Sequence, residues 1–171
     1  MTRLCPKLCF IDGQNIYKSL LDLDLKLNLE KFYDYLQTKY KPEAIFWYVK
    51  YSNHPEILKI HNEYEKIGYT MCYVTKNNDN KANVDADIIT DSLVEFYENG
   101  DYDLVLATGD GDFIPLVRLF ENKSKKVWII AASRQSTAAM LKYDRFSKTH
   151  RSGNIVYINE NLKSCITEIS S

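Results

Sequence analysis

The stretch Leu104-Val-Leu-Ala-Thr-Gly-Asp-Gly-Asp-Phe113 joins a short apolar run to two carboxylates, those of Asp110 and Asp112. The run has the length and aliphatic character of a buried strand, and the glycines end it. Apolar residues resume at helical spacing from Phe113 to Phe120. The pattern therefore predicts a strand, an acidic turn and a helix. In an open α/β sheet, ligands bind beyond the carboxyl ends of the strands, so we expect this turn to lie at the active site.

A second stretch ends in the same way, near the start of the chain. Leu8-Cys-Phe-Ile11 is short and apolar, and Asp12-Gly-Gln-Asn15 follows it directly. We therefore expect a second buried strand with an acid at its tip. The carboxyl ends of parallel strands meet at one edge of a sheet, so Asp12 and Asp110 are expected on the same rim.

Helix and strand patterns alternate through the rest of the chain. This alternation predicts βαβ units with right-handed crossovers, and hence one α/β domain with a parallel sheet and helices on both faces. Residues 20–27 are expected to form a leucine-rich connection, with a short strand as the alternative, and residues 161–171 a loosely ordered tail. The other expected strands are 44–51, 69–75, 126–132 and an edge strand at 154–158, and the expected helices are 28–40, 57–67, 84–97, 113–120 and 137–143.

The composition is that of an ordinary globular domain. The chain has 171 residues, of which 45% are apolar and 26% charged, and it is long enough to bury one core. No apolar run approaches the roughly twenty residues that a membrane span needs, and the first residues lack the apolar core of a signal peptide. We expect a cytoplasmic protein with no membrane partner, and a homo-oligomer is compatible with the sequence.

The cysteines and histidines give no sign of a metal site. Cys5, Cys9, Cys72 and Cys165 include no Cys-x-x-Cys pair, and three of them lie in or beside expected strands. Buried free thiols are therefore favoured over zinc ligands or disulfides. The three histidines, His54, His61 and His150, are scattered without a partner at metal-ligand spacing.

Charge is segregated along the chain. Residues 81–120 hold nine Asp and Glu against two Lys and Arg, whereas residues 121–171 hold four against nine. An acidic centre beside a basic flank suits a cation-dependent enzyme that acts on a polyanion. The alternative is that the basic residues are only a solvated surface.

Several acids at strand tips indicate a cation site. Asp12 and Asp110 each end a strand, Asp112 follows closely, and Asp85 lies where a helix begins after a strand and a loop. Carboxylates that lie a few ångströms apart repel one another, and a bound cation relieves the repulsion. Oxygen ligands without histidine or cysteine favour Mg²⁺ or Mn²⁺, either of which would polarise a phosphate and activate water.

Helix geometry limits which acids share that site. At about 100° per residue, Asp87 and Asp91 lie on one face of the helix, whereas Asp85 points about 160° away from Asp87. Asp85 is therefore best placed to cap the helix and face the rim, and Asp87 and Asp91 are second choices. The plainer readings are that Asp12, Asp110 and Asp112 only shape turns, that Asp85 is only an N-cap, and that Asp87 and Asp91 are exposed helix acids.

Three motifs together resemble one family. They are Phe10-Ile-Asp-Gly-Gln-Asn15, Lys81-Ala-Asn-Val-Asp-Ala-Asp-Ile-Ile-Thr-Asp91, and Thr108-Gly-Asp-Gly-Asp-Phe113 with Pro115. In this order they resemble the NYN domain, LabA-like branch, of the PIN-like nucleases, and the similarity runs from Leu8 to Ile158. The resemblance implies a Rossmann-like fold, an Mg²⁺ or Mn²⁺ site and endoribonuclease activity. It also implies that residues 1–160 form the nuclease domain and residues 161–171 a C-terminal tail.

Carried over by position, the resemblance assigns catalysis and metal binding to four acids. They are Asp12, Asp85, Asp110 and Asp112. The chain departs from many members at Ala82-Asn83, where those have a glycine, and Tyr143-Asp-Arg-Phe146 resembles a late, mainly structural motif. Substrate binding is expected at Asn15, Thr108, Lys81 and Arg134, although Asn15 and Thr108 could instead support their own turns. Further candidates to steer an RNA backbone are Lys76, Lys142 and Arg145.

The leading hypothesis is a metal-dependent ribonuclease that acts on RNA, single-stranded RNA in particular, with tyrosine or tryptophan rings available for base stacking. Two alternatives stay open. A non-cleaving module could bind RNA or a protein partner. A haloacid-dehalogenase-type phosphatase would share the late Gly109-Asp-Gly-Asp112 motif, but such enzymes need an acid two residues after Asp12, where this chain has Gln14.

Overall fold

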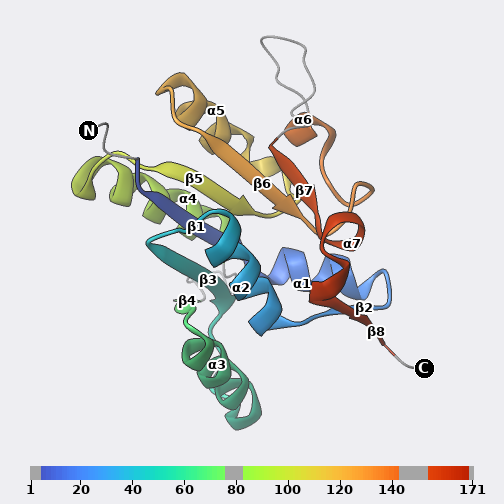
Figure 1. Ribbon diagram of the computed structural model, residues 1–171. Coiled ribbons are helices and arrows are strands. Elements are labelled where there is room, and N and C mark those ends of the chain that lie inside the picture. The colour runs from blue at the N-terminus through green and yellow to red at the C-terminus, as the bar shows by residue number, and fades with distance from the viewer. Residues whose placement is uncertain (1–4, 76–82, 143–153, 170–171) are drawn as a thin grey trace.

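The computed structural model describes residues 5–75, 83–142 and 154–169. Its centre is a six-stranded sheet in which every strand pair is parallel (Figure 1). All six strands were expected from the sequence, and their bounds agree within two residues at most ends. In chain order they are β1 (Lys7–Asp12), β3 (Ala44–Lys50), β4 (Thr70–Val74), β5 (Asp103–Ala107), β6 (Val127–Ala131) and β7 (Ile155–Tyr157).

The strand order is β4-β3-β1-β5-β6-β7, and the order in which the chain adds strands reverses at the centre of the sheet, between β1 and β5. From β1 the chain builds outward through β3 to β4, and then returns to the other side of β1 to build outward through β5, β6 and β7. Strands β1 and β5 are therefore neighbours, with Ile11 opposite Ala107. Ligands bind in the crevice beyond the carboxyl ends at such a reversal. The two acidic turns, after β1 and after β5, flank that crevice.

Helices cover both faces of the sheet, as the alternating pattern predicted. One face carries α1 (Gly13–Leu21), α2 (Leu29–Lys39) and the short α7 (Ile158–Asn161), together with part of α3 (Pro55–Ile67). The other carries α4 (Val84–Val94) and α5 (Ile114–Asn122). In Figure 1, α2 lies in front of the sheet and α4 behind it. The result is a three-layer α/β fold with a separate apolar core on each side of the sheet.

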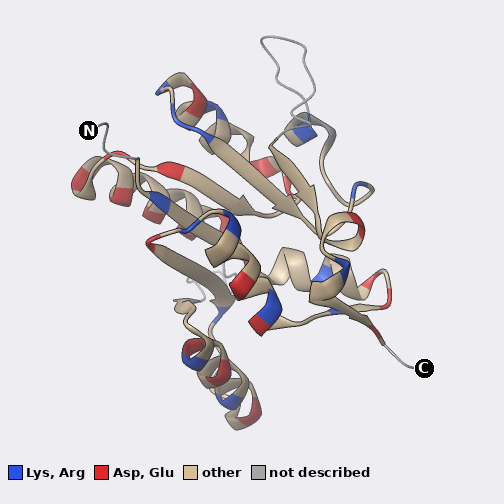
Figure 2. Ribbon diagram, in the orientation of Figure 1, with Lys and Arg blue, Asp and Glu red and all other residues tan. Residues whose placement is uncertain are grey.

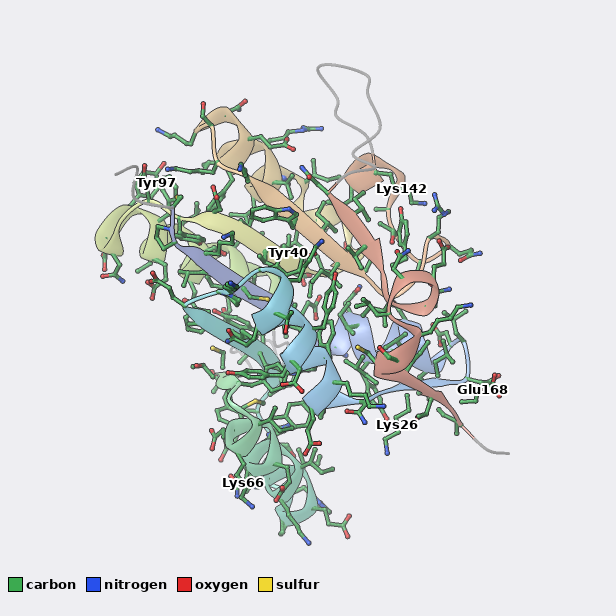
Figure 3. The ribbon with its side chains drawn as sticks, viewed as in Figure 1. Lys26, Tyr40, Lys66, Tyr97, Lys142 and Glu168 are labelled. Atoms are coloured by element: carbon green, nitrogen blue, oxygen red, sulfur yellow. The ribbon has the colours of Figure 1, made fainter. Side chains whose placement is uncertain are left out.

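Aromatic packing joins these layers. Phe10 of β1 stacks on Phe46 of β3 with ring centroids 5.0 Å apart, on the face that α4 covers. On the opposite face Tyr40, just after α2, packs against Trp128 of β6 at 5.7 Å, and Figure 3 labels Tyr40 in this position. The buried Tyr48 hydroxyl donates a 2.8 Å hydrogen bond to Asp91, so this α4 acid anchors its helix to β3.

Helix α1 was not expected from the sequence. It begins directly after Asp12, and its buried residues are Gly13, Ile16 and Leu20. A spacing of four between Ile16 and Leu20 is the helical signal, but the glycine at the first position made the segment resemble a turn. The leucine-rich connection that follows contains the short strand β2 (Leu25–Leu27), which was the alternative considered for it.

The expectation of a loosely ordered tail is wrong as far as Glu168. A 3₁₀ turn, η3 (Lys163–Cys165), leads into β8 (Ile166–Glu168), which pairs antiparallel with β2. Leu162 and Cys165 are buried in the core beside α1 and α2. Burial of these apolar side chains explains why the segment is ordered. The assignment of residues 1–160 as the domain stays a prediction.

Two expectations about the whole chain can be compared with the described residues. No helix among them combines the length and apolar character that crossing a membrane requires. All four cysteines are free: Cys9 and Cys165 are buried, whereas Cys5 and Cys72 are half-buried. Burial raises the pKa of the Cys9 thiol far above its usual value, which keeps it uncharged.

Gly13→Ala tests how tightly the turn after β1 is packed. A Cβ atom at this position would lie 2.2 Å from Nε1 of the buried Trp47, so the substitution is expected to destabilise the fold by about 1–3 kcal/mol. Thermal unfolding should then occur several degrees lower. The matched experiment adds Trp47→Phe, which removes the clashing part of the indole. The double variant should lose less stability than the sum of the two single variants, and strict additivity would contradict this packing argument.

Candidate active site

A cavity of about 260 Å³ opens at the carboxyl ends of β1 and β5. Three of the four acids assigned from the sequence line it, and they arrive from three separate elements. Asp12 comes from the tip of β1, Asp85 from the first turn of α4, and Asp110 from the turn after β5. The complete lining is Asp12, Gln14, Asn15, Lys18, Lys50, Asn83, Val84, Asp85 and Asp110.

Asp12 is the most deeply buried acid of the site, with only 4% of its surface exposed. It is also the N-cap of α1, because its Oδ1 accepts a 3.0 Å hydrogen bond from the backbone N–H of Asn15. Burial raises the pKa of Asp12 to about 6, and the negative charges of Asp85 and Asp110 add to the rise, which the hydrogen bond from Asn15 partly offsets. The Asp12 side chain therefore both caps α1 and presents a carboxyl group to the cavity.

Asp85 faces the cavity but does not cap its helix. The N-cap of α4 is Asn83, whose Oδ1 accepts a 3.1 Å hydrogen bond from Ala86 N–H. The expectation that Asp85 would be the cap is therefore wrong. Burial raises the pKa of Asp85, the charges of Asp110 and Asp112 raise it further, and a side-chain hydrogen bond with Asp12 acts in the opposite direction. Asp12 and Asp85 thus act on each other's ionisation.

The two other acids of α4 lie elsewhere. Asp87 and Asp91 are exposed and do not line the cavity, and Asp91 accepts the hydrogen bond from Tyr48. Figure 2 shows acidic residues along α4 and lysine or arginine residues on α5 and α6 (Ala139–Lys142). The acidic centre of the sequence therefore divides in space into cavity acids and surface acids.

The turn after β5 is built around Asp110. Its Oδ1 accepts a 3.0 Å hydrogen bond from Asp112 N–H and caps the 3₁₀ turn η2 (Gly111–Phe113). Its own N–H donates to Thr108 Oγ1 at 3.1 Å. Thr108 is completely buried, so it supports the turn from beneath and does not border the cavity. Asp112 is exposed and lies outside the lining, although its charge acts on Asp85.

Asn15 links the two acidic turns. Its side-chain Oδ1 accepts a 2.9 Å hydrogen bond from the backbone N–H of Gly109, which is 94 positions away in the chain. Gly109 is confined on its other side, since a Cβ there would lie 3.0 Å from the Ser136 carbonyl oxygen. Asn15 also lines the cavity. It therefore positions the Asp12 and Asp110 turns relative to each other while its amide borders the space where a ligand would lie.

Lys18 and Lys50 were missed from the sequence. Lys18 lies on α1 and Lys50 ends β3, and both border the cavity with exposed side chains. Neither forms an ion pair within 4.0 Å with another described residue. Lys18 could have been found had α1 been predicted, because it lies in the second turn of the helix that Asp12 caps. Lys50 could have been found because it ends a strand next to β1.

The basic residues proposed from the sequence lie elsewhere or outside the described residues. Arg134 pairs with Glu160 at 3.3 Å and lies over the Tyr157 ring at 4.7 Å, and it does not line the cavity. Lys142 is on α6, which packs against η2, and Figure 3 labels it at that end of the molecule. Three more candidates lie outside the described residues: Lys76, Lys81 and Arg145.

The donor chemistry of the cavity suits a hard cation. Three carboxylates border it, and burial together with mutual repulsion raises the pKa of both Asp12 and Asp85. A divalent cation would relieve that repulsion, and Mg²⁺ and Mn²⁺ prefer such oxygen ligands. Within the described part of the chain, no three His, Cys, Asp or Glu side chains are arranged closely enough to hold an ion as they stand.

Comparisons with known proteins agree with this geometry. The family model of the NYN domain matches residues 8–149. The crystal structure of a protein of unknown function from Vibrio parahaemolyticus has the same fold, with a TM-score of 0.71 and 21% sequence identity. The similarity covers 94% of this chain and 97% of that one. None of the curated proteins matches the sequence significantly.

Asp12→Asn is expected to stabilise the metal-free protein at neutral pH. Because the native pKa of about 6 exceeds the usual 3.8, the native state holds this proton more tightly. The resulting stability is present below about pH 4 and is lost as the pH rises through about 6. Asparagine carries no charge and still caps a helix. The variant should therefore gain up to about 3 kcal/mol at neutral pH and nothing below about pH 4.

Thermal unfolding in a chelating buffer across this pH range measures the effect. Asp34→Asn is the matched control, because Asp34 is an exposed acid on α2. The control should follow the wild type at each pH. A variant that is less stable than the wild type at neutral pH, or a gain that does not change with pH, would contradict the assignment.

Proposed function

Because the chain belongs to the NYN domain family, which lies among the PIN-like nucleases, we propose that it is a metal-dependent ribonuclease that hydrolyses phosphodiester bonds in RNA. Within that family, the three sequence motifs favour the LabA-like branch. One observation carries the proposal: three acids from three separate elements border one cavity at the point where the strand order of the sheet reverses. This is the position at which open α/β sheets bind their ligands.

Asp12, Asp85 and Asp110 are the residues that would hold Mg²⁺ or Mn²⁺, with Asp112 just outside the cavity as the fourth acid. Their shared chemistry, hard anionic oxygens with no histidine or cysteine among them, supports this assignment. When bound, such an ion polarises the scissile phosphate and lowers the pKa of an attacking water.

The remaining residues of the cavity suit an anionic substrate. Lys18 and Lys50 carry ammonium groups at the border of the cavity, form no ion pair with any residue that the structure describes, and can pair with phosphate oxygens. Asn15 holds the Asp12 and Asp110 turns together through Gly109, so the spacing of the acids is fixed before a substrate arrives. Fixed groups of this kind need no reorganisation when charge develops on the reacting phosphate.

The test is cleavage of a labelled single-stranded RNA with Mn²⁺, with Mg²⁺ and with chelator. Wild-type protein should cleave only with the metal, and Asp12→Asn or Asp85→Asn should each lower the rate about 100-fold or more. Asp87→Asn is the matched control, since Asp87 lies on the same helix as Asp85 but outside the cavity. Equal cleavage by wild type, Asp12→Asn and Asp85→Asn would refute the assignment. Tight RNA binding without any metal-dependent product would favour a non-cleaving module.

Metal binding itself has an independent measurement. A ligand that binds only the native state raises its stability, by about 2.7 kcal/mol at a hundred times its Kd. Mn²⁺ should therefore raise the unfolding temperature of the wild type and of Asp87→Asn by several degrees, and that of Asp12→Asn much less. An equal rise in all three proteins would place the ion elsewhere.

A further inference from the structure

The backbone pairing between β3 and β4 continues to Tyr51, the residue that follows β3. The backbone N–H of Tyr51 donates a 2.9 Å hydrogen bond to the carbonyl of Val74 at the end of β4. Lys50, the residue before it, borders the acidic cavity. Consecutive Cα atoms are about 3.8 Å apart, so the backbone of Tyr51 is held at the carboxyl edge of the sheet, one residue beyond a lysine of the cavity, although Tyr51 itself is not part of the lining.

Two tyrosine rings are exposed at this edge. The side chain of Tyr51 is 55% exposed and that of Tyr73 is 38% exposed. Their ring centroids lie 6.3 Å apart and the ring planes meet at 86°, so the edge of one ring faces the other. The ring of Tyr73 also lies near the buried His61 on α3, with the two ring centroids 5.4 Å apart. We call Tyr51 and Tyr73 together the tyrosine pair.

Strand alternation sets the direction in which the pair points. Tyr73 is paired in register with Val49 of β3. Tyr51 lies two residues after Val49, and its N–H continues the pairing with β4, so all three are on the face covered by α3. Lys50 points to the opposite face, where α4 and the cavity lie. A polymer that crosses the carboxyl edge of the sheet would therefore meet Lys50 and the acids first and the tyrosine pair next.

Neither tyrosine of the pair belongs to the apolar core on this face. Trp47, Tyr64 and Tyr69 already pack together there, with Trp47 5.1 Å from each of the other two rings. The tyrosine pair thus leaves aromatic surface in water near Lys50, which forms no ion pair with another described residue. A nucleic-acid strand offers the matching chemistry, since phosphates pair with lysine and unpaired bases stack on aromatic rings.

We propose that the tyrosine pair is a base-stacking subsite for a nucleotide adjacent to the phosphate in the cavity, with Lys50 contacting the intervening backbone. This rests on the proposed function, because it assumes that the cavity receives an RNA phosphate. Bases of a duplex are already stacked on each other and must be unstacked to reach a protein ring. The subsite therefore selects single-stranded RNA.

The test measures binding apart from cleavage. Fluorescence anisotropy of a labelled oligouridylate in chelating buffer gives Kd for wild type, Tyr51→Ala, Tyr73→Ala and Tyr51→Trp. The alanine variants should raise Kd about ten-fold, the cost of losing one stacked base, whereas Tyr51→Trp should keep the wild-type Kd or lower it. Binding of a duplex of the same length should be unaffected by the alanine changes.

Tyr97→Ala is the matched control. Tyr97 is a 62% exposed tyrosine in the π-helical turn η1 (Glu95–Asn99) that follows α4, and Figure 3 shows it far from α3. Its substitution should leave Kd unchanged. An unchanged Kd in Tyr51→Ala and Tyr73→Ala, an equal loss for single strand and duplex, or no binding by wild type would each overturn the subsite. Wild type that binds the single strand through the tyrosine pair but releases no product with Mn²⁺ would instead refute the nuclease while leaving the subsite in place.

Discussion

One hydrogen bond, from the backbone N–H of Gly109 to the side chain of Asn15, joins the two turns on which the site depends. The parallel sheet brings the ends of β1 and β5 side by side, but each turn leaves its strand independently. Without a link, two turns that both carry an acid would move apart, because Asp12 and Asp110 repel each other. The Asn15 link, and the 2.9 Å hydrogen bond that Ala138 N–H donates to the Gly109 carbonyl, hold the acids in one cavity despite that repulsion.

The same repulsion gives the site its chemistry. Asp12 is buried at the N-terminus of α1, where the first backbone N–H groups favour a negative charge, yet its pKa is still raised to about 6. Burial and neighbouring carboxylates therefore outweigh the helix terminus. Because ionisation of such a carboxylate is unfavourable without a counter-charge, a bound cation would stabilise its charged form. The lysines at the border of the cavity lie too far from the acids to pair with them within 4.0 Å, and so they remain available to a substrate.

The sequence predicted most of the sheet, because buried parallel strands are continuous apolar runs and the acids follow them directly. It predicted Asp12, Asp85 and Asp110 as neighbours because parallel strands share a carboxyl edge. It missed α1, since Gly13 hides a helix start, and with it Lys18. It left Asn15 and Thr108 between substrate binding and support of their own turns. Thr108 does support its own turn, through Asp110 N–H. The bond from Gly109 to Asn15 spans 94 positions, and no local pattern encodes it. The strand β8 was missed because three residues pair with a distant partner, β2.

Asp12 is at once the cap of a helix and an acid of the cavity, and this double role bears on how the protein can evolve. Asparagine satisfies the structural half of the role, because its side-chain oxygen can also accept the N–H of Asn15. One base change in the codon converts this aspartate to asparagine. The asparagine would still cap the helix, and the buried negative charge would be removed. Members of such a lineage can therefore exchange the acid for a neutral cap without passing through an unstable intermediate. Helix capping alone therefore does not explain why this position carries an aspartate.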